Sequence, residues 1–386
     1  MKNSIGIIGM NCRAAAQSAK NLGLDVHLAC YFADVDTCRI SDSVFCLQSD
    51  STKPDMQEYS VTKLVDFAIE KLSGRVGSII PTSGVGCSPN ALKKLEKNFE
   101  VVGNGSRKVA RAKDWKTVKK VLGRIGAKYP KTIVANEHGL KKSVEKTGFP
   151  CVVKPQVQGV GTRARLVESY EDLEDLKTYG DVLVQEYVEG VPVSCSVLSD
   201  GENAAAISVN KQIIGETRFG AASRFKYCGN IVPLGAADGV LSEIKRMSEN
   251  IISALGIIGS NGVDYVLSGG VPYFMEVNTR LQDTMENVEK YRGINMVEKH
   301  IDACKGNIEV IDCHNKKSYG KAVVYAKKDM RIGDLRGLDG VSDIPHAGTI
   351  VQKSQPVCSV YAEGKTEDDV FGGLVKKVAH VYGSTL

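Results

Sequence analysis

One stretch, residues 262–280, limits the possible folds of this chain more than any other. It is predicted to form two strands joined by a turn at Ser-Gly-Gly, and the second strand reads Tyr-Phe-Met-Glu-Val-Asn-Thr-Arg. Side chains two residues apart share one face of a strand, so Glu276 and Asn278 point the same way. The hairpin return brings Asp264 alongside them from the first strand. Two carboxylates and an amide oxygen are therefore expected to converge on one sheet face.

Hard oxygen donors of this kind suit Mg²⁺, which takes a few protein oxygens and completes its octahedron with phosphate and water. We interpret Asp264, Glu276 and Asn278 as a magnesium site. The alternative is the polar face of a solvated hairpin. Arg280 lies on the same strand face and is expected to point at whatever the metal holds, unless it forms a salt bridge to Glu276 or Asp283.

A second group of residues upstream suits a nucleotide. Lys154 ends the apolar strand Pro-Cys-Val-Val-Lys, where a buried ammonium is costly without an anion to meet it. A loop containing Gly159, Gly161 and Thr162 follows, and its backbone N–H groups can cradle phosphates. Residues 182–190 are predicted to be a strand that runs into a turn, whose backbone could hydrogen-bond the edge of an adenine.

The first hundred residues have a different sequence pattern, in which short apolar strands alternate with helical patterns such as the one over 61–72. This alternation predicts a parallel α/β sheet. The first turn lacks the G-x-G-x-x-G spacing, which argues against a dinucleotide-binding oxidoreductase. Strand-rich segments follow after residue 150, and a third block from Tyr319 closes with a helix around 369–381.

Length and composition narrow the class of protein. With 386 residues, 42% apolar and 25% charged, the chain is expected to fold into two to three globular domains. The net charge of +5 is spread along the sequence, which gives no footprint for nucleic acid and only a mild bias toward phosphates. No apolar run approaches the roughly 18 residues of a membrane span. We expect a cytoplasmic protein that binds neither membranes nor nucleic acids.

Eleven cysteines raise the question of disulfides or a metal cluster. Their number is odd and the sequence contains no C-x-x-C. Most of them sit within apolar runs. The prediction is reduced, largely buried thiols.

The order of these motifs resembles that of the ATP-grasp enzymes, with Glu-Val-Asn-Thr-Arg-Leu-Gln most similar to the biotin carboxylase and carbamoyl-phosphate synthetase branch, including archaeal-type carboxylase-related members. The resemblance implies a mixed α/β and α+β fold. A Rossmann-like pre-ATP-grasp domain would span 1–108, and the ATP-grasp domain 109–315, with subdomains 109–184 and 185–315. A small β-rich domain would occupy 316–386.

The resemblance also implies ATP and Mg²⁺ as ligands and assigns roles around the phosphates. Lys154 would contact the α- and β-phosphates, and the glycines Gly159 and Gly161 would lie in the phosphate loop. The first ATP lysine of the family usually follows Asp directly, but Trp115 stands there. Lys116, or failing that Lys113, would take the role.

The same resemblance places adenine against the segment that begins at Gln185. Glu186 and Val188 would offer backbone groups to the base, and Glu189 is a candidate for the ribose. Asp264, Glu276 and Asn278 would hold one or two Mg²⁺ ions. Arg280 would stabilise an acyl phosphate or a tetrahedral intermediate.

Two departures from the family pattern bear on the reaction. The Arg that precedes the metal Asp in D-alanine ligase-like members is Gly262 here, and the Glu base of biotin carboxylases is Thr284. The sequence also lacks a Met-Lys-Met biotin-carrier segment. The predicted activity is an ATP-dependent ligase that joins a carboxylate to an amine. Carboxylation through carboxyphosphate, or a catalytically silent ATP-binding regulatory protein, are the alternatives.

The stretch 217–230 interleaves cations with aromatic rings. Arg218, Arg224 and Lys226 alternate with Phe219, Phe225 and Tyr227. Cations beside aromatic faces suit an anionic or ring-bearing substrate, so the three basic residues are predicted to bind an acceptor. The alternative is a solvated strand and loop. The identity of the substrates and the oligomeric state, a homodimer included, stay open.

Overall fold

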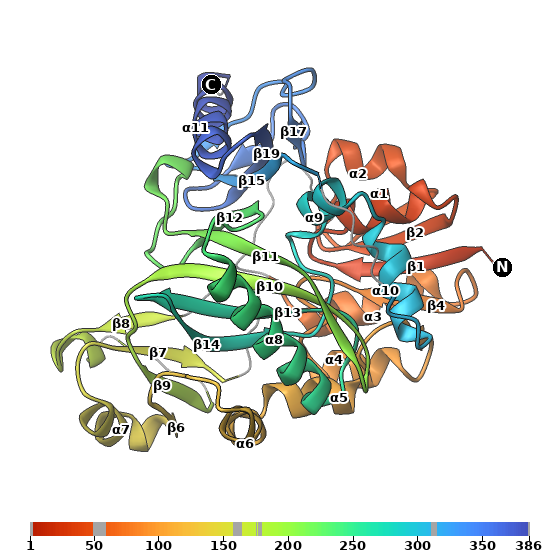
Figure 1. The fold of residues 1–386 in the computed structure, drawn as a ribbon. Helices are drawn as coiled ribbons and strands as arrows, with labels where there is room; N and C mark the ends of the chain where they lie inside the picture. Colours follow the sequence, from red (N-terminus) through yellow and green to blue (C-terminus); the bar gives the residue numbers. More distant parts are fainter. Residues whose placement is uncertain are drawn as a thin grey trace.

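The computed structural model describes residues 3–48, 59–156, 164–174, 176, 180–309 and 315–384. Their strands form a five-stranded parallel sheet, a four-stranded and an eight-stranded antiparallel sheet, and a two-stranded ribbon. Figure 1 shows the parallel sheet on one side of the molecule, the four-stranded sheet on the opposite side, and the large sheet between them. This arrangement confirms the predicted combination of α/β and α+β architecture.

The N-terminal part is a doubly covered parallel sheet with the strand order β3-β2-β1-β4-β5. Its strands are β1 (Ser4–Gly9), β2 (Asp25–Cys30), β3 (Ser43–Cys46), β4 (Ser78–Pro81) and β5 (Glu100–Val101). Its helices are α1 (Arg13–Asn21), α2 (Val35–Ile40), α3 (Val61–Leu72), α4 (Pro89–Leu95) and α5 (Ser106–Lys113). The order reverses between β1 and β4, so their carboxyl ends border the crevice where α/β sheets commonly bind ligands.

Helix α3 shows why the local sequence pattern was readable. Ser60 caps it by accepting a hydrogen bond from the Lys63 amide, and its buried residues Leu64, Val65, Ala68 and Leu72 recur at helical spacing. The predicted helix over 61–72 is therefore confirmed.

The four-stranded sheet has the order β6-β9-β7-β8 and is covered by a short helix. It contains β6 (Thr132–Ala135), β7 (Cys151–Pro155), β8 (Arg165–Val167) and β9 (Val182–Glu186), with α7 (Leu140–Thr147) and the 3₁₀ turns at Glu137–Gly139 and Glu171–Leu173. Helix α6 (Trp115–Ile125) connects the parallel sheet to this part. Its apolar face, which includes Trp115 and Val118, packs into the main core.

The eight-stranded sheet has the order β14-β13-β10-β11-β12-β15-β19-β17. Its strands are β10 (Val191–Asp200), β11 (Ala204–Ile214), β12 (Tyr227–Val232), β13 (Ile258–Ser268), β14 (Val271–Asn278), β15 (Ser318–Tyr325), β17 (Val341–Ser342) and β19 (Pro356–Gly364). The associated helices are α8 (Asp238–Leu255), α9 (Met285–Arg292), α10 (Met296–Cys304) and α11 (Glu367–Gly383), with a 3₁₀ turn at Thr217–Phe219. A separate ribbon pairs β16 (Met330–Arg331) with β18 (Ile350–Val351).

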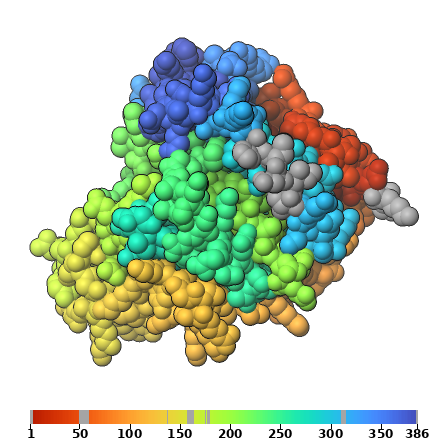
Figure 2. Space-filling model, in the orientation of Figure 1, coloured from red at the N-terminus to blue at the C-terminus, as the bar shows by residue number. Residues whose placement is uncertain are grey.

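Three of the C-terminal strands, β15, β19 and β17, extend the large sheet, because β15 pairs with β12. The other two, β16 and β18, form the separate ribbon. The C-terminal residues also lie against the N-terminal sheet, as Figure 2 shows for the blue and red surfaces. The Val35 amide donates to the carbonyl of Ile344 at 2.8 Å, which joins the two ends of the chain. The domain boundaries given above stay a prediction.

The cysteines are free thiols wherever the structure describes them. Six of these ten are buried, as the sequence predicted, and Cys313 lies outside the described residues. Among those residues no helix has the length and apolar character needed to cross a membrane.

Candidate active site

The hairpin β13–β14 brings the three predicted metal ligands together. Its register places Asp264 opposite Glu276 and Gly262 opposite Asn278. The Asn278 Nδ2 donates to Asp264 Oδ2 at 2.9 Å, and Gln212 donates to the other oxygen of Asp264 at 3.2 Å. All three side chains line one cavity of about 360 Å³, which we call the triad cavity. The predicted convergence is present in the structure, whereas metal binding stays a prediction.

The charges of these three side chains favour the binding of a cation. Burial and the adjacent charge of Glu276 together raise the pKa of Asp264 to about 7, against the hydrogen bond from Asn278. No described lysine or arginine lies within 4.0 Å of either carboxylate as an ion-pair partner. The described residues also contain no cluster of three acidic, His or Cys donors, so the amide oxygen of Asn278 would be the third ligand. A divalent cation suits this donor set.

Two lysines lie close to the carboxylates of the triad. Lys154, on β7, is 9% exposed and donates from Nζ to the carbonyl of Met275 at 3.5 Å. Burial lowers the pKa of Lys154, and the charge of Glu276 works against that lowering. Lys113, at the end of α5, donates from Nζ to the carbonyl of Val277 at 2.9 Å. Both ammonium groups therefore lie beside the strand that carries Glu276.

The predicted ATP lysine Lys116 lies away from these residues. Lys116 is exposed on the outer face of α6, because Trp115 and Val118 on the same helix turn into the core. It lines none of the cavities described here, whereas Lys113 lines two of them. Lys113, the alternative that the sequence left open, lies at the cavities, and the identity of the first ATP lysine stays a prediction.

A small apolar cavity of about 40 Å³ adjoins the triad cavity, and we call it the apolar cavity. Its walls include Trp115, Val118, Leu183 and Phe274, together with Lys154. Lys113 and Glu276 line both cavities, so the two are continuous along these side chains. An apolar wall with charged groups at one end suits a ring that carries an anionic tail.

The predicted adenine segment lies at the end of β9, close to this wall but not in it. Gln185 is buried and donates to the hydroxyl of Thr132 at 2.9 Å, so its side chain is held within the sheet. The Glu186 amide donates to the carbonyl of Lys131 at 2.9 Å. Val188 is partly buried and Glu189 is exposed, and their nucleotide contacts stay a prediction. Gly159, Gly161 and Thr162 lie outside the described residues.

Arg280 lines the triad cavity and also a second, adjoining cavity that is described below. Its Nη1 donates to the carbonyl of Leu281 at 2.9 Å, and among the described residues it has no ion pair within 4.0 Å. The salt bridges to Glu276 and Asp283 that the sequence allowed are therefore absent. The loop after β4 passes close by, because a Cβ on Gly86 would come within 3.0 Å of the Arg280 Cβ.

Sequence reasoning missed the contribution of the N-terminal sheet to this site. Ser83, Gly84 and Cys87, from the loop after β4, line the triad cavity. Burial alone would raise the pKa of the Cys87 thiol, but Lys113 and Arg280 lower it below its ordinary value. The Thr-Ser-Gly-Val-Gly-Cys run after an apolar strand was the available signal.

Asn104 also plays a part that its sequence context did not reveal. It is buried, and its side chain donates to the carbonyl of Thr279 at 3.2 Å and accepts from the Ile258 amide at 2.8 Å. These bonds fix the start of β13 and the end of β14 against the N-terminal part. Asn104 thereby holds the backbone between Asn278 and Arg280.

The three predicted acceptor residues lie away from the triad cavity, and acceptor binding by them stays a prediction. Arg218 pairs with Glu216 at 2.8 Å and lies over the ring of Phe371, while Arg224 lies over Tyr187. Lys226 lies 4.4 Å from the ring centre of Tyr325. None of these three cations lines the triad cavity, whereas Phe225 and Tyr227 do. Residues 217–219 form a 3₁₀ turn, and residues 220–226 form a loop that leads into β12.

Gly262 and Thr284, the two departures from the family pattern, are both closely packed. A Cβ at Gly262 would fall 1.7 Å from the amide nitrogen of Gln282, so a glycine is required for that side chain to cross β13. Thr284 is buried, and its hydroxyl lies 3.4 Å from that of Ser196. Neither position offers a titratable group to the triad cavity.

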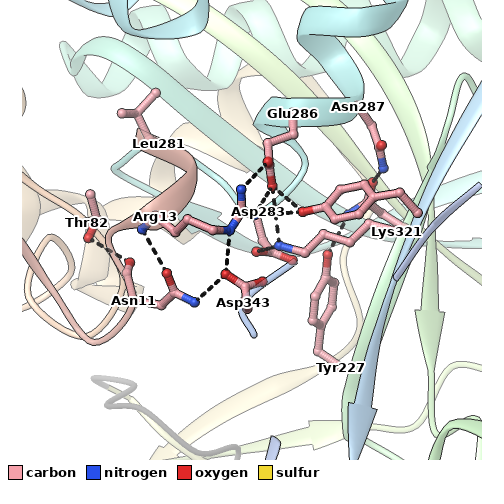
Figure 3. A network of polar contacts seen from close by, with 12 residues as sticks. Asn11, Arg13, Thr82, Tyr227, Leu281, Asp283, Glu286, Asn287, Lys321 and Asp343 are labelled. Atoms are coloured by element: carbon pink, nitrogen blue, oxygen red, sulfur yellow. Dashed lines mark hydrogen bonds and ion pairs between the residues drawn. The ribbon is translucent and has the colours of Figure 1, made fainter. Parts of the chain in front are cut away.

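A further cavity of about 320 Å³ borders the triad cavity, and we call it the network cavity. Figure 3 shows the ion pairs on its wall, which come from three parts of the chain. Arg13 donates to both oxygens of Glu286, at 2.8 and 2.7 Å, and to Asp343 at 2.7 Å. Lys321 donates to Asp283 at 2.7 Å.

The chain is similar to known proteins in sequence. Residues 112–284 match a family described as an ATP-grasp domain. An uncharacterized protein of Methanocaldococcus jannaschii is 27% identical over 364 residues, which covers 92% of this chain and 87% of that protein. The carbamoyl phosphate synthase large chain of Neisseria meningitidis is 27% identical over 217 residues, and the match spans 53% of this chain but only 19% of that protein.

Solved structures are similar over almost the whole chain. Biotin carboxylase from Campylobacter jejuni, in a complex with β-γ-ATP, superposes with a TM-score of 0.75 at 15% identity, covering 99% of this chain and 91% of that one. The L-amino acid ligase from Bacillus licheniformis has a TM-score of 0.72 at 15% identity, covering 98% and 97%. At these identities the similarity establishes the fold.

Proposed function

Since this chain is an ATP-grasp superfamily protein, we propose that it uses ATP to activate a small-molecule carboxylate and joins the acyl group to an amine. The observation that carries the proposal is the triad of Asp264, Glu276 and Asn278 on one cavity wall, with Arg280 beside it and, among the described residues, no ion-pair partner within 4.0 Å of either carboxylate. Unpaired buried charges of this kind are costly and are kept where a ligand supplies the partner.

The nucleotide would lie across the two continuous cavities. The apolar cavity, with Val118, Leu183 and Phe274, supports binding of the base, although its volume requires the neighbouring side chains to give way. Lys154 and Lys113 would then face the phosphates as point charges. Asp264, Glu276 and Asn278 would hold Mg²⁺, which when bound would neutralise charge on the transferring phosphoryl group.

The reaction has two balanced steps. A substrate carboxylate oxygen attacks the γ-phosphorus, the bond to the β,γ-bridging oxygen breaks, and ADP leaves. The amine nitrogen then attacks the acyl carbon, the carbon–oxygen bond to phosphate breaks with its electron pair, and the nitrogen loses a proton. Arg280 would orient the carboxylate and stabilise the negative charge that develops on its oxygen.

Amide formation is favoured over carboxylation of biotin by the surroundings of Thr284. This position and its neighbour Ser196 offer hydroxyl groups, and a hydroxyl is a poor base for bicarbonate at neutral pH. The fold similarity to an L-amino acid ligase is consistent with an amine acceptor. Its sequence identity of 15% supplies no more than that consistency.

The test is ADP formation by the purified chain with MgATP and pools of small carboxylates, with and without pools of amines, followed by mass analysis of the product. We expect ADP and an amide only when both pools are present. ADP release with bicarbonate and no amine would support carboxyphosphate chemistry instead. ATP binding without ADP formation in any mixture would support the silent regulatory protein.

Glu276→Ala tests the metal triad directly. Loss of one charged ligand should lower the rate of ADP formation about a hundredfold or more while the fold is kept. The matched control is Glu363→Ala, an exposed carboxylate on β19 that pairs with Lys317. Full activity of Glu276→Ala would refute the assignment.

A further inference from the structure

One short segment of the chain is strongly basic. Residues 107–131 contain ten lysines and arginines and a single acidic residue, Asp114, which gives the segment a net charge of +9. The rest of the chain has 40 basic and 44 acidic residues, a net charge of −4. The net charge of the whole chain hides this separation, so the expectation of an evenly spread charge without a nucleic-acid footprint is wrong for this segment.

The fold places these basic side chains together on the outside of two helices. Helix α6 turns its apolar side, which includes Trp115 and Val118, into the core. Figure 1 shows α5 and α6 next to each other at the lower edge of the molecule. We call their solvent-exposed basic side chains the basic face, namely Arg107, Arg111, Lys116, Lys119, Lys120 and Arg124.

No acidic group in the described part of the chain neutralises the basic face. None of its six side chains has an acidic partner within 4.0 Å there. Asp114, the acidic residue of the segment, caps α6 and accepts from the Thr117 amide at 3.0 Å. Arg111 donates to a backbone carbonyl, that of Ala254, at 3.1 Å. The face therefore presents its positive charge to the solvent.

This concentration of charge is unfavourable for α6 itself. Lys116, Lys120 and Arg124 follow one another at intervals of four residues, and like charges at this spacing repel each other on a helix surface. The first turn of α6 holds no acidic residue, although the helix dipole favours negative charge there. An anionic partner on the basic face would remove both unfavourable terms.

The shape of the basic face favours a polymer of regularly spaced phosphates. With a rise of 1.5 Å per residue, Lys116, Lys120 and Arg124 form a row with steps of about 6 Å. No large exposed apolar side chain of the described residues lies on α5 or α6. The face therefore lacks the apolar anchors that insert into a bilayer or form the centre of a protein interface. It also lacks aromatic rings on which the bases of a single strand could stack.

We propose that the basic face binds the sugar–phosphate backbone of a nucleic-acid duplex without reading its base sequence. The proposal does not depend on the proposed ligase function. Trp115 and Val118, on the inner side of α6, line the apolar cavity, whereas the basic face lies on the outer side of the same helix. A duplex on the basic face and MgATP in the cavities can therefore be bound at the same time.

Fluorescence anisotropy with the full chain tests the binding. The probes are labelled RNA and DNA duplexes of about 20 base pairs in two unrelated sequences, titrated from about 50 mM KCl upward. We expect equal affinity for the two sequences and a loss of affinity with rising salt, with a slope of about −0.9 per phosphate contacted. Excess MgATP should leave the binding unchanged.

Three results would overturn the proposal. The first is no duplex binding at the lowest salt concentration. The second is displacement of the duplex by MgATP, which would place the probe in the nucleotide cavities. The third is tighter binding to phosphatidylserine–phosphatidylcholine vesicles or to polyglutamate than to either duplex, which would favour a membrane or an acidic protein as the partner.

A pair of double variants locates the binding on the molecule. Lys120→Gln combined with Arg124→Gln should weaken duplex binding about tenfold and reduce the salt slope by about two. Lys327→Gln combined with Lys328→Gln removes two exposed lysines after β15, and this matched control should bind as wild type does. The α6 variant should unfold at the wild-type temperature or above it, because it removes repulsion between like charges. Equal losses of affinity in the two double variants would contradict a site on α5 and α6.

Discussion

The triad cavity and the network cavity adjoin each other, yet their buried carboxylates have opposite environments. In the triad cavity, burial and Glu276 raise the pKa of Asp264 to about 7. In the network cavity, burial alone would raise the pKa of Asp343, but Arg13 and Lys321 lower it well below its ordinary value. Among the described residues, the triad carboxylates have no ion-pair partner within 4.0 Å, whereas Asp343 pairs with Arg13 at 2.7 Å.

On the proposed function, the difference separates a site that a ligand would complete from a set of ion pairs that joins parts of the fold. Arg13 belongs to the N-terminal sheet, Glu286 to α9, and Asp343 to the C-terminal residues, so their ion pairs join three parts of the chain. The pair of Asp264 and Glu276 joins only two adjacent strands that are already hydrogen-bonded. Its unfavourable charge is explained by binding and not by stability.

The largest effect is expected on protein stability, when the ion pairs of the network cavity are removed. Arg13→Met would leave Glu286 and Asp343 buried without their partner, and should lower the free energy of unfolding by about 3–5 kcal/mol. Urea denaturation measures the change. Arg336→Met, which removes an exposed arginine paired with Asp334, is the control and should change stability little. Equal effects of the two substitutions would contradict the role given to Arg13.

A smaller effect is expected at the triad cavity, where ionisation of Asp264 lowers stability as the pH rises. The folded-state pKa of Asp264 lies above its ordinary value of 3.8, so the folded chain holds this proton more tightly than the unfolded one. The corresponding stability is present at low pH and is lost as the pH rises from about 4 to about 7. Asp264→Asn should abolish this fall, which thermal unfolding across that pH range measures.

The network should respond to pH in the other direction. The pKa of Glu286 is lowered, since Arg13 and Lys321 outweigh its burial, as they do for Asp343. Their contribution is present above the ordinary carboxyl pKa and is lost as the pH falls below about 4. A wild-type profile identical to that of Asp264→Asn would show that the triad carboxylates are not strained by their charge.

The smallest effect is expected on the reactivity of the Cys87 thiol, which lines the triad cavity. The pKa of Cys87 is lowered by Lys113 and Arg280, which outweigh its burial, whereas burial and nearby aspartates raise the pKa of Cys38. The rate of alkylation by iodoacetamide should therefore rise at a lower pH for Cys87, and MgATP should slow it at Cys87 only. Peptide mass analysis gives both rates. A common pH midpoint for the two thiols would contradict the environment assigned to Cys87.

Much of the site was predictable because its pattern is local. The face shared by Glu276 and Asn278, and the return of the hairpin to Asp264, follow from the two-residue period of a strand. The choice between Lys113 and Lys116 did not follow, because it depends on where α5 ends and how α6 turns Trp115 into the core. The positions of the cations at 217–230 did not follow from the sequence either, because a loop has no side-chain period from which they could be predicted.

The sequence by itself determined the alternating N-terminal sheet, the reduced thiols and the hairpin that carries the triad, because each depends on neighbours within a few residues. Only the tertiary structure decided that Arg13 meets Asp343 and Tyr361, residues more than three hundred positions away. It alone placed Cys87 and Asp283 on the same cavity wall. Contacts between distant segments are set by how sheets and helices pack, and local periodicity does not encode that packing.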